Sequence, residues 1–67
     1  MVEFTSPGSV QDSLRFAVAA LQSSGYTVGR GEDSPGESHL PFTRDGRPGV
    51  VLLVAVDACN TKWQIEA

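Results

Sequence analysis

A run of seven apolar residues, at positions 50–56, constrains the fold of this chain more than any other feature. Four of the seven are valine, whose branched side chain is stiff at χ1 and packs well in a pleated strand. The run follows Gly49 and ends at Asp57, and it is far too short to cross a bilayer. We therefore expect it to be the central strand of a small sheet, buried on both faces.

One amphipathic helix is predicted over residues Ser9–Gln22. Ser9 and Asp12 have the spacing of a capping box, and Gly25 suits the left-handed conformation that often follows a helix. Phe16 falls outside the apolar stripe, so we expect it either at the edge of the core, which is the favoured position, or exposed for a partner. Apolar side chains recur at helical spacing at Val10, Leu14, Ala17, Val18 and Leu21.

Shorter segments on either side of the helix have strand-like patterns. Alternating apolar residues predict strands at Tyr26–Val28 and His39–Arg44, and the turn residues Asp45-Gly46 predict a hairpin into the apolar run. Residues 1–8 form either a short edge strand or a flexible arm. Residues 62–67 form a last strand or a short helix, and the alternation of Trp63 with Ile65 favours the strand.

These elements predict a single α+β domain over residues 1–67, with the order (β)-α-β-β-β-β. One helix would pack on a three- to four-stranded antiparallel sheet. Residues 29–38, between the predicted strands Tyr26–Val28 and His39–Arg44, contain three glycines, one proline and three acids. We expect them to form a mobile loop, whose acids Glu32, Asp33 and Glu37 are either solvated or used for docking.

The composition excludes several classes of function. Eight acids against five bases give a net charge of −3, which does not favour binding to nucleic acid. Cys59 is the only cysteine and His39 the only histidine, so neither an internal disulfide nor a zinc site is expected. We expect Cys59 to be a small buried residue, and we expect no cofactor. No membrane segment or signal peptide is predicted, and the expected location is cytoplasmic, in a bacterial or phage-infected cell.

A few polar and aromatic side chains are candidates for a site. His39 can act as an acid or base near neutral pH, or it can simply be an exposed strand residue. Arg44 and Arg47 flank the Asp45-Gly46 turn and could hold phosphates or carboxylates, whereas ordinary hairpin solvation is the simpler interpretation. Trp63 is expected in the core, with an interface anchor as the alternative.

One set of motifs resembles the HicA type of toxin ribonuclease. In those proteins a helix is followed by Gly-aromatic, then by Gly-Ser-His, an aromatic residue and Asp-Gly-Arg before an apolar strand. This chain has Gly25-Tyr26, then Gly36-Glu37-Ser38-His39, then Phe42, and then Asp45-Gly46-Arg47. The resemblance implies a metal-independent ribonuclease with His39 as its catalytic histidine. Glu37 interrupts the Gly-Ser-His motif, and the family is basic whereas this chain is acidic.

The first hypothesis is therefore a small, acidic, non-enzymatic protein-binding module. Such an inhibitor, adaptor or accessory protein would bind a protein partner, or a second copy of itself, through a sheet edge and the acidic loop. Its expected binding residues are Glu32, Asp33, Glu37, Arg44, Arg47 and Trp63. The alternative is the ribonuclease that uses His39.

Overall fold

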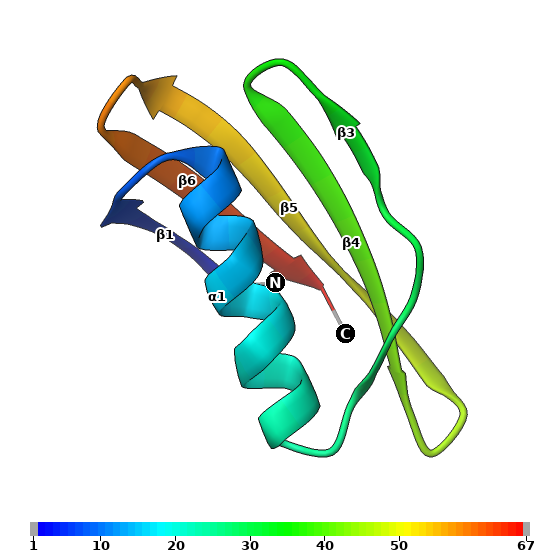
Figure 1. The fold of residues 1–67 in the computed structure, drawn as a ribbon. Coiled ribbons are helices and arrows are strands. Elements are labelled where there is room, and N and C mark those ends of the chain that lie inside the picture. Colours follow the sequence, from blue (N-terminus) through cyan, green and yellow to red (C-terminus); the bar gives the residue numbers. More distant parts are fainter. Residues whose placement is uncertain (1, 67) are drawn as a thin grey trace.

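The computed structural model describes residues 2–66, so that Met1 and Ala67, which end the two predicted terminal strands, lie outside the described range. One helix lies against one face of a six-stranded antiparallel sheet (Figure 1). The elements are, in chain order, β1 (Val2–Pro7), α1 (Val10–Ser23), β2 (Thr27–Val28), β3 (Glu32–Ser34), β4 (Glu37–Arg44), β5 (Arg47–Asp57) and β6 (Asn60–Glu66).

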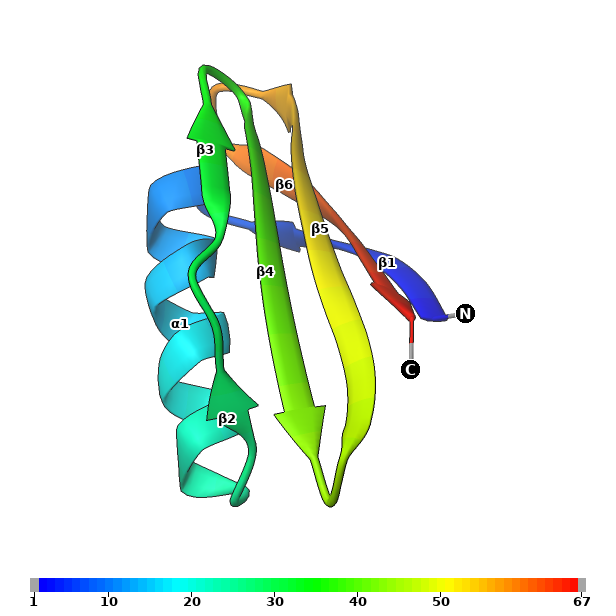
Figure 2. The ribbon, with the colours of Figure 1, turned by 90° about the vertical axis from the view of Figure 1, so that its right-hand side faces the viewer.

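The order of strands across the sheet is β1-β6-β5-β4-β2, and β3 also pairs with β4. β5, which contains the apolar run, is therefore the central strand, as predicted. β2 and β3 follow one another along the same side of β4 (Figure 2). The first strand of the chain pairs with the last, because β1 lies antiparallel to β6 at the opposite edge.

The helix is formed where the sequence predicts it, shifted by one residue. The Ser9 side chain accepts a hydrogen bond from the backbone N–H of Asp12 at 3.1 Å, and Asp12 provides negative charge in the first turn. The chain leaves the helix through Gly25, whose φ of 87° is in the left-handed region that favours glycine. Among the described residues, no helix is long and apolar enough to cross a membrane.

The core lies between α1 and one face of the sheet. Alternate residues of β4 and β5 point toward the helix, and Leu53 of the central strand is fully buried. Gly49 lets the ring of Phe42 lie against its backbone, since a Cβ atom there would stand 2.4 Å from that ring. The buried apolar side chains are Ala17, Leu40, Phe42, Val51, Leu53 and Trp63.

Burial of β5 on both faces was a wrong prediction. Val50, Leu52 and Val54 point away from α1 and are only half-buried, because no described element covers that face of the sheet. A run of apolar residues therefore does not require two covering layers. On the open face, flanking side chains from β4 and β6 shield the run in part.

The α+β class, with one helix and an antiparallel sheet, is confirmed, but the sheet has six strands and not three to four. The additional pairing comes from residues 29–38, where Glu32–Ser34 form β3 and Glu37 already begins β4. Gly31 makes this pairing feasible, because a Cβ atom at that position would lie 2.0 Å from the carbonyl oxygen of His39. Residues 60–66 form a strand, the favoured one of the two alternatives.

Candidate functional site

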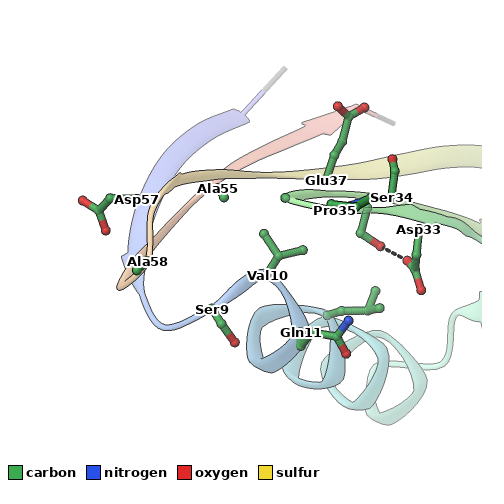
Figure 3. A pocket seen from close by; sticks show the side chains of 13 residues that line it. Ser9, Val10, Gln11, Asp33, Ser34, Pro35, Glu37, Ala55, Asp57 and Ala58 are labelled. Atoms are coloured by element: carbon green, nitrogen blue, oxygen red, sulfur yellow. Dashed lines mark hydrogen bonds between the residues drawn. The ribbon is translucent and has the colours of Figure 1, made fainter.

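An open groove lies at one end of the sheet, beside the expected acidic loop (Figure 3). It runs between the start of α1, the turn from β3 to β4 and the turn from β5 to β6, and its volume is about 480 Å³. Its apolar lining includes Val10 at the start of α1, Pro35 in the turn from β3 to β4 and Ala55 near the end of β5. Three acids, Asp33, Glu37 and Asp57, lie around the groove, but the carboxylates of Glu37 and Asp57 point away from it (Figure 3). The described lining residues include no Lys or Arg.

Two of these acids also hold the local structure together. Asp33 accepts a hydrogen bond from the buried hydroxyl of Ser38, which ties β3 to β4. Asp57 accepts hydrogen bonds from the backbone N–H of Cys59 at 2.8 Å and from the amide of Asn60 at 3.0 Å. These bonds favour the carboxylate and hold the pKa of Asp57 below its usual value, with the Cys59 bond as the largest cause.

His39 lies outside the groove, on the open face of the sheet. Its Nε2 atom is 2.8 Å from a carboxylate oxygen of Glu37, and both side chains are about half exposed. Arg44 and Arg47 lie opposite one another at the far end of the β4–β5 hairpin. Arg44 is five positions along β4 from His39, a distance of about 17 Å at about 3.4 Å per residue. The structure therefore does not bring the arginines to the histidine.

The two arginines form a separate, basic tip of the molecule. The Arg44 guanidinium lies over the ring of Tyr26, 5.2 Å from its centroid, while Arg47 and Asp45 are exposed around the turn. The expected acids Glu32, Asp33 and Glu37 lie at the other end of β4. Charge of opposite sign is thus separated along the long axis of the sheet.

Trp63 is in the core, 7% exposed, and its indole N–H donates to the hydroxyl of Ser6 at 2.8 Å. Phe4 stacks on it with a centroid separation of 5.2 Å, and Phe16 meets it edge-on at 6.4 Å. Phe4 is 43% and Phe16 70% exposed. Trp63, the residue named as a possible interface anchor, is therefore the buried member of this aromatic cluster, and the exposed rings are those of Phe4 and Phe16.

Two expectations about single residues need correction. Phe16 lies at the surface, which was the second alternative and not the favoured one; its departure from the apolar stripe was the signal for this. Cys59 is exposed in the turn between β5 and β6, whereas a buried position was expected. Within residues 2–66, no group of three or more His, Cys, Asp or Glu side chains is placed to hold a metal ion.

Comparisons of the chain with protein-family models, with curated proteins and with solved structures gave no match. The resemblance to the HicA-type ribonucleases therefore rests on the short motifs around Gly25, His39 and Asp45 alone.

Proposed function

We propose that this chain is a non-enzymatic protein-binding module that holds a basic segment of its partner at the acidic end of the sheet. One observation carries the proposal: a groove lined by the apolar side chains of Val10, Pro35 and Ala55 lies at the end of the sheet where three acids gather, and none of its described lining residues is basic. An apolar side chain flanked by Lys or Arg is the complement of such a surface.

The edge of the sheet beside the groove supports the same mode of binding. β3 is paired only with β4, so an extended segment of a partner can continue the sheet along β3 while its side chains enter the groove. Glu32 and Glu37 are exposed on β3 and β4 and can attract a basic segment from solution.

Charge reversal at the groove tests the proposal. The tagged chain captures its partner from lysate, and the affinity for that partner is then compared between the wild type and the double variant Gln11→Lys, Glu37→Lys. Gln11 lies on α1 beside the groove and the Glu37 side chain lies on the open face of the same end of the sheet. Both residues are exposed, so the fold should be kept. We expect an affinity loss of about tenfold or more, which corresponds to ~1.4 kcal/mol per factor of ten.

Asp45→Lys provides the matched control, because it reverses a charge at the opposite, basic tip. It should leave the affinity unchanged, and the wild-type affinity should fall as salt is added. Equal losses for groove and control variants, or an affinity unaffected by the groove variant, would refute binding at the acidic end. Capture of RNA in place of a protein would refute the binding-module proposal itself.

The ribonuclease remains the second candidate function, and one observation favours it. The contact between His39 and Glu37 at 2.8 Å resembles a general base with an orienting carboxylate. It predicts that the purified chain cleaves RNA without added metal and that His39→Ala abolishes the cleavage while circular dichroism stays unchanged. Cleavage that survives this substitution would exclude the role of His39.

A further inference from the structure

The outer edge of β1 presents backbone groups in a regular pattern. The N–H of Gly8 donates to the carbonyl of Cys59 at 2.7 Å, one step beyond the last residue pair of the β1–β6 ladder. Hydrogen-bonded and non-hydrogen-bonded pairs alternate in an antiparallel ladder. The even-numbered residues of β1 therefore bond to β6, and Glu3, Thr5 and Pro7 direct their backbone polar groups outward.

The side chains beside this edge are exposed and apolar. α1 lies over β2, β4, β5 and β6 and makes no close approach to β1 within residues 2–66. On the helix side of β1, Val2 is 58% and Phe4 43% exposed, and Phe16 projects from the helix against Trp63, the ring on which Phe4 stacks. An extended edge with neighbouring exposed aromatic rings is the kind of surface that natural proteins usually cover or block.

We propose that a second copy of this chain covers the edge, with the two β1 strands antiparallel and the two-fold axis passing through the pair formed by Phe4 and Phe4 of the second copy. In this register Glu3 is a hydrogen-bonded partner of Thr5 in the second copy. Each outward N–H of Glu3 and Thr5 then meets an outward carbonyl, and the sheet continues through the dimer.

Neighbouring registers are less favourable for identifiable reasons. A two-fold axis at Glu3 places the two Glu3 carboxylates directly opposite one another, which is destabilising. A two-fold axis at Thr5 pairs Glu3 with Pro7, which has no N–H to donate to the Glu3 carbonyl. The register centred on Phe4 avoids both problems, because Pro7 then lies beyond the paired Glu3–Thr5 segment.

The side chains also suit the register centred on Phe4. Residues in a non-hydrogen-bonded pair have Cα atoms about 4.5 Å apart, so the two Phe4 rings come into contact and extend the stack that each makes with Trp63. On the other face, the Glu3 carboxylate is already held by Gln64 at 2.9 Å and by Lys62 at 3.4 Å. It would lie beside the uncharged Thr5 of the second copy.

The strength of the dimer follows from its size. Six-residue strands and the Phe4 side chains bury less than the roughly 1,200 Å² of a standard stable interface. We therefore expect a dimer that dissociates on dilution. Such a small, self-complementary surface fits a second copy, because the same strand supplies donors and acceptors in matching positions about the axis.

A disulfide tests the register directly. In a Cys59→Ser background, Phe4→Cys should give an oxidised dimer, because a Cα separation of about 4.5 Å is within disulfide range. Glu3→Cys is the matched control: the proposed register offsets the two Glu3 positions by two residues, beyond the limit of about 7 Å. Cross-linking by Glu3→Cys but not by Phe4→Cys would overturn the register.

A second pair of variants tests the edge without changing the aromatic cluster. Thr5→Pro removes an outward N–H that β1 does not use in its ladder with β6, whereas Thr5→Val keeps it. Light scattering of the wild type and Thr5→Val should show the apparent mass rising twofold from 7.1 kDa with concentration. Thr5→Pro should stay at 7.1 kDa, with the circular dichroism of the wild type.

A wild type that remains monomeric at the highest soluble concentration would overturn the dimer. So would a dimer that survives Thr5→Pro and does not cross-link through Phe4→Cys, since another surface would then join the copies. If Thr5→Pro fails to fold, the comparison of Phe4→Cys with Glu3→Cys still tests the dimer and its register. The inference is independent of the proposed function, because Thr5→Pro leaves the acidic groove intact and the groove variants leave the β1 edge intact.

Discussion

The two edges of the sheet have opposite characters. β1 is six residues long, unbroken and flanked by the exposed rings of Phe4 and Phe16. The other edge is made of β2 and β3, which have two and three residues and are separated by Gly29–Gly31. Short strands and a local irregularity are devices by which proteins blunt an edge. The comparison indicates that β1 offers six residues for regular strand pairing, whereas β3 offers a partner only three.

The two edges are also attached by different means. β1 is held by the aromatic cluster around Trp63, whereas β3 is held by a close backbone contact at Gly31 and by the bond between Ser38 and Asp33. Removing one attachment should therefore loosen one edge and leave the other in place. The predictions below use this difference.

The largest effect is expected from Trp63→Ala. The substitution removes a buried indole that contacts Phe4, Phe16 and Ser6, and comparable substitutions cost about 3–5 kcal/mol. Stability of small domains is only about 5–15 kcal/mol, so much of the chain should unfold. Trp63→Phe, which loses the hydrogen bond to Ser6, should cost about 1 kcal/mol plus the smaller packing loss.

Urea unfolding measures both variants at Trp63. If Trp63→Ala costs less than Trp63→Phe, the indole does not anchor β1. Hydrogen exchange of partly folded material should show the amides of β1 released before those of β4.

Gly31→Ala should have an intermediate effect on the opposite edge. The added Cβ would stand 2.0 Å from the carbonyl oxygen of His39, so the backbone has to shift, at a cost of about 1–3 kcal/mol. Hydrogen exchange should rise in β3 while β1 keeps its protection. Ser34→Ala, at an exposed position of the same strand, is the control and should change stability by less than about 0.5 kcal/mol. Equal loosening of both edges would contradict their independence.

The smallest effect concerns the charge that links β1 to β6. Hydrogen bonds from Gln64 and then from Lys62 hold the pKa of Glu3 below its ordinary value of 4.5. Because the folded state favours the carboxylate, this stabilisation is present above the ordinary pKa and is lost as the pH falls through the lowered one. The stability advantage of the wild type over Glu3→Gln should therefore shrink between about pH 5 and pH 3. A constant difference across this range would contradict the role of Glu3.

Local signals in the sequence predicted the elements that local interactions decide. The spacing of Val10, Leu14 and Leu21 and the cap at Ser9 predicted α1 to within one residue. The Asp45-Gly46 turn predicted the hairpin of β4 and β5, and the structure has Asp45 at a φ of 54° and Gly46 at 77°. These signals depend on neighbours in the chain and can therefore be read from it.

What the sequence did not reveal depends on contacts between distant segments. The pairing of β3 with β4 depends on the close approach of Gly31 to the carbonyl oxygen of His39. The alternation of apolar and polar residues in the sequence does not indicate such a contact. The open face of β5 depends on how many layers the whole chain provides, which the run at 50–56 cannot show. The exposure of the aromatic rings also depends on contacts between distant segments. Trp63 was a candidate anchor from its residue type, but the exposed rings of the cluster are those of Phe4 and Phe16.

The pairing of β1 with β6 also orders the events of folding. Residue pairs such as Val2 with Ile65 join the two ends of the described chain, so the loop that closes between them spans almost its whole length. Hairpins such as β4–β5 can form early, whereas β1 has no neighbour until β6 has been synthesised and has docked. β1, whose outer edge is the most exposed in the folded state, is therefore also the strand that remains unpaired longest during folding.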